Sequence, residues 1–231
     1  VQLASGEQVC SILPVEQFVE NKYVVMITEK GIIKKTSLDA FGNPRQAGII
    51  ALTTDLDDRV VDCKISDGQS DVFVATKEGM SIRFNENDVR AMGRSARGVK
   101  GITLAEKDVV MAMEILEKNT QDTILMVTSK GYGKRSEVSE YRIQSRGGSG
   151  IITQKTTDKV GQVVGTRKVS ATQELILSTD QGQVIRMKIS DISVLGRNTQ
   201  GERLINLDDK QEFLTVLAVI LNEDRAGEET H

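Results

Sequence analysis

The 231-residue chain has no tryptophan, only 3% aromatic residues, and a single histidine at its last position, His231. Proteins that hold single-stranded nucleic acid stack its bases on Phe, Tyr or Trp, so this composition disfavours such a platform. The lack of an internal histidine also disfavours a His-dependent catalytic triad and a His-built metal site. The sequence therefore predicts no catalytic residues, no metal and no cofactor.

Proline and cysteine each occur twice, and no apolar run approaches the ~20 residues that span a bilayer. The opening "VQLASGEQVC" has neither the basic start nor the apolar stretch of a signal peptide. Cys10 and Cys63 lie in apolar runs without metal-type spacing. We interpret this as a reduced, cytoplasmic chain with two buried thiols and no membrane partner.

A repeat is what the sequence does contain. Four apolar runs end in Thr-x-x-Gly, as in "VVMITEKG" and "ILMVTSKG", and a basic residue stands four positions past each glycine. The spacings between these glycines are 48, 52 and 51 residues. Four short strands per ~50 residues are typical of a propeller blade, so the sequence predicts an all-β fold of four-stranded blades. The glycines, which supply the positive φ of hairpin turns, are Gly31, Gly79, Gly131 and Gly182.

The repeat also predicts the organisation of the chain. Residues 1–15 are similar to the last two strands of a repeat and are expected to end a preceding blade. The polar, mostly acidic tail at 222–231 is expected to be disordered. Because one unit cannot bury its apolar faces alone, neighbouring blades should stack. The four full blades are expected at residues 16–65, 66–116, 117–169 and 170–221.

Charge is segregated along the chain. The stretches 31–48, 79–101, 131–150 and 182–203, which run from each turn glycine through the next loop, together carry +9, and the remainder carries −12. A belt of such loops suits a continuous polyanion, bound through its backbone without sequence preference. A solvated strand face explains the same charges, so charge alone leaves both interpretations open. The candidate contact residues are Lys34, Lys35, Arg45, Arg83, Arg90, Arg94, Arg97, Lys100, Lys134, Arg135, Arg142, Arg146, Arg186, Arg197 and Arg203.

Three long motifs resemble a known family. "VRAMGRSARGVKGI" (89–102), "TSKGYGKRSEVSEY" (128–141) and "ISDISVLGRNTQG" (189–201) are similar to the C-terminal domain of the DNA gyrase A subunit, over about residues 1–221. The resemblance implies a β-pinwheel, a propeller-like disc whose neighbouring blades exchange strands. It also implies a non-catalytic domain at the nucleoid that wraps double-stranded DNA around a basic rim. In this family the domain works with the rest of gyrase A and with gyrase B in ATP-dependent negative supercoiling.

The family's gyrase box reads Gln-Arg-Arg-Gly-Gly-Lys/Arg-Gly, and the third repeat holds a degenerate form of it. A topoisomerase IV-type C-terminal domain for substrate selection is the alternative within the family, and a protein-interaction propeller is the alternative outside it. The tyrosines Tyr23, Tyr132 and Tyr141 are expected to be partly buried strand aromatics rather than nucleophiles. The residues of the box that are kept are Gln144, Arg146, Gly147, Gly148 and Gly150.

Overall fold

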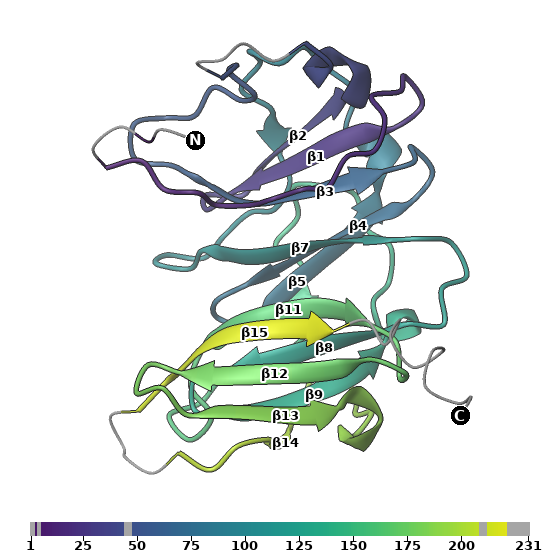
Figure 1. Ribbon diagram of the computed structural model, residues 1–231. Coiled ribbons are helices and arrows are strands. Elements are labelled where there is room, and N and C mark those ends of the chain that lie inside the picture. The colour runs from purple at the N-terminus through teal and green to yellow at the C-terminus, as the bar shows by residue number, and fades with distance from the viewer. Residues whose placement is uncertain (1–2, 4–5, 44–47, 208–211, 221–231) are drawn as a thin grey trace, which may run out of the picture. The chain divides into compact units, whose positions relative to one another are not determined.

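The computed structural model describes residues 3, 6–43, 48–207 and 212–220, and its only helical elements there are single 3-10 turns among antiparallel strands (Figure 1). The predicted all-β fold is therefore confirmed. The chain divides into two compact units, and each is described by itself. The first comprises Val1–Ala75, Ile82–Lys118 and Ile143–Gly150, and the second comprises Thr76–Ser81, Asn119–Arg142 and Ile151–His231.

Each repeat starts with a hairpin whose tight turn is the Thr-x-x-Gly motif. The four turn glycines have φ values from 78° to 89°, and each N–H donates to the carbonyl of the threonine three residues earlier, at 2.9–3.2 Å. In three repeats the threonine hydroxyl also accepts a hydrogen bond, from the N–H four residues later. The predicted equivalent turns are thus confirmed. The hairpins are β1 (Tyr23–Thr28) with β2 (Ile32–Ser37), β4 (Asp71–Thr76) with β5 (Met80–Asn85), β8 (Thr123–Thr128) with β9 (Tyr132–Glu137), and β12 (Glu174–Thr179) with β13 (Val184–Lys188).

After the hairpin, every repeat makes one 3-10 turn, a long loop and a seven-residue strand. This last strand pairs antiparallel with the first strand of its own hairpin, as in β3 with β1 and β15 with β12. The 3-10 turns are η1 (Leu38–Phe41), η2 (Glu86–Asp88), η3 (Val138–Glu140) and η4 (Ile189–Asp191). The seven-residue strands are β3 (Val60–Ser66), β7 (Val110–Leu116), β11 (Val163–Val169) and β15 (Leu214–Ile220).

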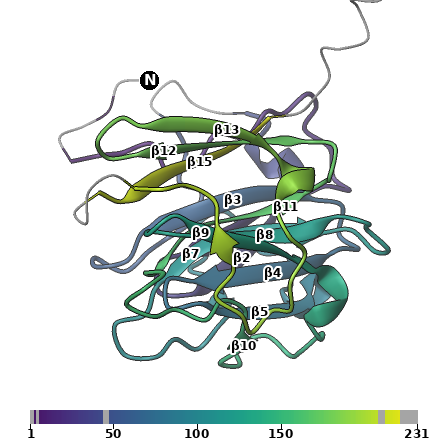
Figure 2. The same cartoon turned by 90° about the horizontal axis from the view of Figure 1, so that it is seen from below.

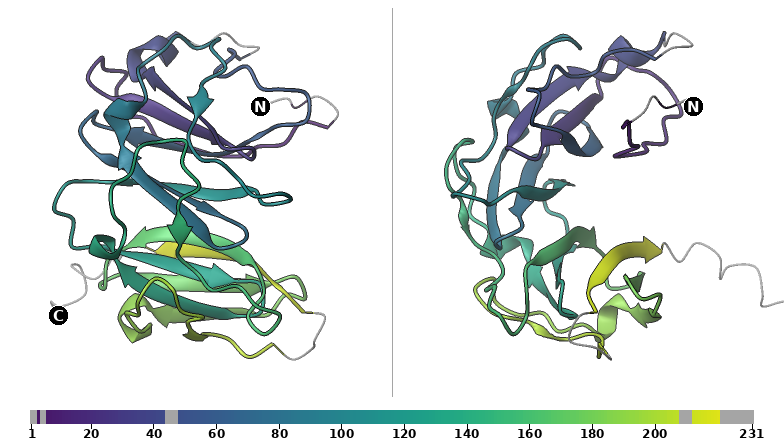
Figure 3. Two further views of the ribbon diagram at one scale, coloured as in Figure 1. Left: turned by 180° about the vertical axis from the view of Figure 1, so that it is seen from behind. Right: turned by 90° about the vertical axis from the view of Figure 1, so that its left-hand side faces the viewer.

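The outer strand of three sheets comes from the following repeat. The two-residue strands β6 (Val99–Lys100), β10 (Ile151–Ile152) and β14 (Glu202–Arg203) pair with β2, β5 and β9. Figure 3 shows the strands from two further sides. The sheet orders are β3-β1-β2-β6, β10-β5-β4-β7 and β11-β8-β9-β14, followed by the three-stranded β13-β12-β15 (Figure 2). The strand exchange that the family resemblance implied is therefore present.

Each unit has its own apolar core. In the first unit, Val25 and Ile27 of β1 pack with Val72 of β4, Phe84 of β5 and Met113 of β7. Successive residues of β1 and β4 are buried without alternation, because both faces of these strands are covered. Burying side chains of this size contributes about 1.5–3 kcal/mol each. The core of the second unit brings together Leu125, Val127, Val169, Leu175, Leu177 and Leu214.

One expectation for the first unit, that both thiols are buried, is wrong, and the assignment of residues 1–15 to the end of a preceding blade stays a prediction. No strand forms among residues 3 and 6–15, the described part of that segment. A strand needs a hydrogen-bonding neighbour, and here Val9 and Ile12 stay 60% and 84% exposed. Cys10 is exposed rather than buried, and Cys63 is half-buried. Burial raises the pKa of Cys63 to about 12, so this thiol is protonated at neutral pH.

Candidate nucleic-acid interface

The basic loop of each later repeat is joined to the hairpin of the repeat before it. The second hairpin strand makes a parallel bridge to this loop at equivalent positions, Lys35 with Ala91, Arg83 with Ile143 and Arg135 with Val194. Each loop then continues into the outer strand of that same preceding sheet. The loops are therefore fixed by backbone pairing at both ends.

Two candidate lysines are buried where the loop of one repeat meets the hairpin of the repeat before it, and we call this contact a joint. Lys34 and Lys134, both 0% exposed, occupy the same position in repeats one and three. The Lys34 amino group donates to the carbonyl oxygens of Ala51, at 2.7 Å, and of Arg94. The Lys134 amino group donates to the carbonyl oxygens of Gly196, at 2.8 Å, and Arg197.

Burial shifts the titration of both lysines. Desolvation, assisted by the Arg94 charge, lowers the pKa of Lys34 from 10.5 to about 8. Desolvation also lowers the pKa of Lys134 to about 8, where Glu140 opposes the shift and Arg197 adds to it. Neither amino group is placed to meet a ligand directly, so we do not retain them as contact residues.

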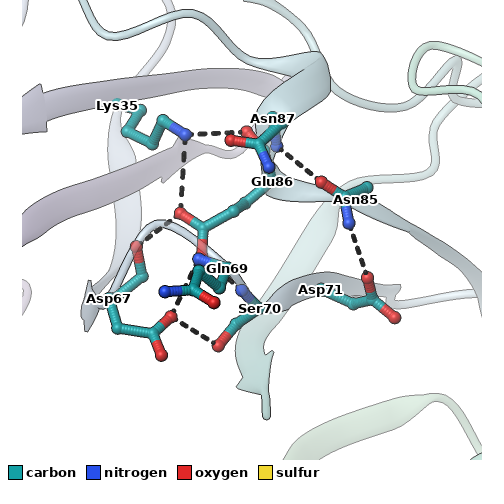
Figure 4. A network of polar contacts seen from close by, with 9 residues as sticks. Lys35, Asp67, Gln69, Ser70, Asp71, Asn85, Glu86 and Asn87 are labelled. Carbon is teal, nitrogen blue, oxygen red and sulfur yellow. Dashed lines mark hydrogen bonds and ion pairs between the residues drawn. The ribbon is translucent and has the colours of Figure 1, made fainter. Parts of the chain in front are cut away.

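Lys35 is also buried, within a polar network that joins the first two repeats (Figure 4). Its amino group donates to the Glu86 carbonyl oxygen at 3.0 Å and lies 3.5 Å from a Glu86 carboxylate oxygen. The same carboxylate accepts from the Ser66 hydroxyl at 2.6 Å and from the Ser70 N–H at 2.7 Å. The Lys35 amino group also lies over the Tyr23 ring, 4.9 Å from its centroid, in a cation–π contact.

The equivalent cations of the other repeats are paired as well. The buried Arg135 donates its Nε–H to the Ile192 carbonyl at 2.9 Å. Arg83 forms an ion pair with Asp71 at 2.8 Å, and Arg186 donates to Glu174 at 2.6 Å. Of these three, only Arg186 has a largely exposed side chain, at 61%. The position therefore serves packing in most repeats.

Two of the three loop arginines, Arg146 and Arg197, anchor their loops through the guanidinium group. Arg146 donates to the carbonyl oxygens of Asp88, at 2.8 Å, and Lys100, at 3.0 Å. Arg197 donates to the carbonyl oxygen of Ile152, at 2.7 Å, which is the equivalent of Lys100 in the repeat. Arg94, Arg146 and Arg197 are all half-buried. Arg45, expected to be their counterpart in the first loop, lies outside the described residues.

The degenerate gyrase box is joined to the preceding loop by further backbone bonds. Gly147, with φ of 81°, donates its N–H to the Gly101 carbonyl at 2.7 Å. The carbonyl oxygen of Gly148 accepts from the N–H of Thr103 at 2.9 Å. Gln144 donates its N–H to the Arg83 carbonyl at 2.8 Å. An added Cβ at Gly147 or Gly148 would lie 3.6 Å from its nearest neighbour, so the positive φ of Gly147, and not close packing, favours glycine in the box of this repeat.

Besides Arg186, five candidate cations are exposed, and two of these have partners. Arg97 pairs with Asp55, and Arg203 lies 5.2 Å from the Tyr132 ring centroid and donates to its hydroxyl at 2.8 Å. The side chains without a hydrogen-bond or ion-pair partner among the described residues are Arg90, Lys100 and Arg142. Arg90 and Arg142 stand at the same position of the repeat, two residues past the end of the 3-10 turn.

Tyr23 and Tyr132 lie on strands as predicted, whereas Tyr141 directly follows η3. Tyr141 is 1% exposed and its hydroxyl oxygen accepts from Thr153 at 2.8 Å. Burial raises the pKa of Tyr141 above its usual value. Tyr132 is 7% exposed, and Tyr23 is half-buried. None of the three is placed as an exposed, activated hydroxyl.

Sequence reasoning missed the structural role of Lys34 and Lys134, although the sequence carried a signal. The third residue past the turn glycine alternates along the repeats as Lys34, Ile82, Lys134 and Ile185. Isoleucine at this position in two repeats indicates that the position is buried, and the lysines at the same position in the other two repeats are then expected to be buried as well. The net charge of a window counts such buried cations together with exposed ones and hides the difference.

The fold and the joined loops can now be compared with known proteins. The family model of the DNA gyrase C-terminal domain, a beta-propeller, matches residues 22–67, 70–117, 122–170 and 173–220. The chain belongs to this family. The gyrase A protein of Haloquadratum walsbyi is 40% identical over 94% of the chain, and that of Staphylococcus aureus strain MRSA252 is 36% identical over 99%. The chain spans about a quarter of these relatives, 26% in both cases.

Solved structures agree with this assignment. A structure of the DNA gyrase A C-terminal domain matches 96% of the chain and 73% of its own length, with a TM-score of 0.85 and 26% identity. The C-terminal domain of DNA topoisomerase IV matches 94% of the chain and 68% of its own length, with a TM-score of 0.86. Its 22% identity makes that likeness one of fold. Within the described residues, no helix is long and apolar enough to cross a membrane.

Proposed function

We propose that this gyrase A C-terminal domain binds duplex DNA without sequence preference and bends it around its basic loops. In the holoenzyme, with the rest of gyrase A and with gyrase B at the nucleoid, this wrapping supports ATP-dependent negative supercoiling. The observation that carries the proposal is the pair Arg90 and Arg142. They are exposed, lack partners among the described residues and stand at the same position of two loops that backbone pairing holds in place.

Exposed, unpaired cations on a fixed backbone are what a phosphate contact requires. Arg and Lys that meet phosphates release condensed counterions, and this release dominates non-specific DNA affinity. A preordered loop adds to the affinity because its cations lose less conformational freedom on binding. The acidic remainder of the chain, −12 in total, repels DNA from other surfaces. We therefore narrow the proposed contacts to Arg90, Lys100 and Arg142, with Arg97, Arg186 and Arg203 able to contribute after exchanging partners.

We propose that the domain is non-catalytic by itself. DNA cleavage by a tyrosine needs a hydroxyl that reaches the phosphate, and Tyr132 and Tyr141 are buried. No group of three or more His, Cys, Asp or Glu side chains in the described part of the chain is arranged to hold a metal ion. These observations support an accessory role in which chemistry is carried out elsewhere in the enzyme.

Duplex binding at several salt concentrations tests the proposal. We expect the logarithm of affinity to fall with the logarithm of salt with a slope of roughly −5 if six phosphates are engaged, and equally for unrelated DNA sequences. Replacing Arg90, Lys100 and Arg142 together by alanine should flatten the slope by roughly 1 for each phosphate that the variant no longer neutralises. The control replaces Lys22, Lys107 and Lys118, which are exposed outside the basic loops and change the charge equally.

An unchanged slope in the loop variant, or an equal change in the control, would show that these loops are a solvated face. Failure of the unmodified chain to bind duplex DNA at low salt would favour the protein-interaction propeller instead. Incubating the chain with plasmid, Mg²⁺ and ATP, with and without the remaining parts of gyrase, tests the accessory role. Nicked product or ATP hydrolysis by the chain alone would contradict it.

A further inference from the structure

Repeats one and three share a feature that repeats two and four lack. The position that carries Lys34 and Lys134 carries Ile82 and Ile185 in the alternate repeats. All four side chains are buried or half-buried, so the place itself suits apolar groups. A lysine there loses the hydration of its ammonium group, which is costly unless fixed hydrogen-bond partners replace the water. The hydrogen-bond acceptors of the two ammonium groups indicate the role of each lysine.

Both lysines bind the same part of the loop that follows. Each amino group donates to the main-chain carbonyl of the loop arginine, Arg94 for Lys34 and Arg197 for Lys134. Lys134 also donates to the Gly196 carbonyl, at 2.8 Å, and to the Thr199 hydroxyl, at 3.1 Å. Three donors on one ammonium thus meet three acceptors at the loop tip.

Neighbouring side chains complete the attachment in the second unit. Arg135 donates to the Ile192 carbonyl at 2.9 Å, and Ser136 donates to the Leu195 carbonyl at 2.7 Å. Strand β9 therefore engages the carbonyls of residues 192, 195, 196 and 197. Carbonyl oxygens that bind a buried donor are turned away from solvent. The partial negative charge of these carbonyls then faces the protein. The exposed cations beside the two loops include Arg90 and Lys100 at the loop that Lys34 holds and Arg203 at the loop that Lys134 holds.

We propose that Lys34 and Lys134 are positioning residues for DNA binding, each holding the loop of the next repeat in the conformation that meets the duplex. The inference rests on the proposed DNA-binding function and extends it to two side chains that DNA does not touch. Losing the ammonium frees the carbonyls at the loop tip, and the loop then samples conformations in which fewer cations reach phosphate. The affinity for DNA should therefore depend on the protonation of buried amines.

The charged groups that face each lysine are few. Arg94 faces Lys34, while Glu140 of η3 and Arg197 of the loop face Lys134. The lowered pKa values of Lys34 and Lys134, both about 8, lie between pH 7 and 9, so both amino groups lose their charge across that window.

The test compares the unmodified chain with a Lys34→Met, Lys134→Met variant. The control is Lys107→Met, Lys118→Met, which removes the same charge from exposed sites. We expect the buried-lysine variant to bind roughly eightfold more weakly at 0.1 M salt for each phosphate that it no longer reaches, with a slope flatter by roughly 0.9 per phosphate. Raising the pH from 7 to 9 should weaken DNA binding by the unmodified chain and by the control, but not by the buried-lysine variant.

Folding is monitored by circular dichroism and thermal unfolding. If the methionine variant unfolds, Lys34→Ile and Lys134→Ile replace it, because repeats two and four already hold isoleucine at this place. The pH profile of the unmodified chain needs no substitution, and a flat profile from pH 7 to 9 overturns the inference. Equal binding by the folded variant and the parent also overturns it, and leaves the proposed function intact. If the parent does not bind DNA at all, the proposed function fails first.

Discussion

A carboxylate at position 86 occupies a place that the other repeats fill with apolar side chains. Leu38, Val138 and Ile189 stand at the equivalent position and are all buried. Glu86 is 0% exposed there, and its partners are Lys35, the Ser66 hydroxyl and the Ser70 N–H (Figure 4). A buried ion pair of this kind adds little net stability over a hydrophobic replacement, but losing one partner leaves a buried charge. It acts as a specific joint between the first two repeats.

The pair gives a prediction at the residue scale. Glu86→Leu alone should destabilise the chain by about 3–5 kcal/mol, because Lys35 keeps its charge without a carboxylate. Adding Lys35→Met should recover most of this loss, because both members are then apolar and similar in volume. Urea unfolding of the parent, both single variants and the double variant measures the coupling. If the double variant loses as much free energy of unfolding as the two single variants together, Glu86 and Lys35 do not act as a coupled pair.

At this scale the sequence locates the recurring cations but not their exposure. The basic residue four positions past each turn glycine was assigned to DNA contact, yet Lys35 and Arg135 are buried and Arg83 is paired with Asp71. Sequence position reports that a cation recurs, and it does not report which way the side chain points. Exposure depends on the loop of the following repeat, which is distant in sequence and bridges the backbone of Lys35, Arg83 and Arg135.

At the scale of the element, the hairpin and the blade period were predictable because their signals are local. Glycine at a tight turn and β-branched runs on both sides determine the hairpin within about 15 residues. The sheet to which the short strands β6, β10 and β14 belong is not a local property. Two residues are too few to indicate in the sequence which hairpin they join. The partner hairpin is selected by hydrogen bonds to the carbonyl oxygen of its turn glycine, as when Gly79 accepts from the N–H groups of Thr153 and Gln154.

Two turn glycines offer a matched pair that tests this exchange. Both have positive φ, 82° at Gly79 and 89° at Gly182, so alanine is strained equally in both turns, by about 1–2 kcal/mol. A Cβ at Gly79 would lie 2.2 Å from the Gln154 carbonyl oxygen of the donated strand, whereas one at Gly182 would meet nothing within 4 Å. Gly79→Ala should therefore cost about 1–3 kcal/mol more than Gly182→Ala in chemical denaturation. Equal losses of unfolding free energy in the two variants would mean that the donated strand does not pack against the turn at Gly79.

At the scale of the whole molecule, charge segregation is the property that the sequence predicted without any structure. Basic stretches that total +9 alternate with acidic ones in a chain whose net charge is only −3. Among the described cations of these stretches, fewer than half are exposed and so available to phosphate. The salt slope should accordingly reflect the few free cations and not the full count of basic residues.

Wrapping is distinct from binding and makes its own prediction. Smoothly bending a 20–30 bp duplex by 40–90° costs on the order of 1–6 kcal/mol, which a wrapping protein must offset with additional contacts. Two-nucleotide single-strand gaps placed one helical turn apart remove part of this bending energy and leave most phosphates in place. We expect gapped DNA to bind more tightly than intact duplex of the same length, about fivefold for each 1 kcal/mol of bending energy removed. Competition binding at constant salt measures the ratio, with a short gapped duplex below one helical turn as the control. Equal affinity for gapped and intact DNA, together with a steep salt slope, would show that the domain binds straight DNA and does not wrap it.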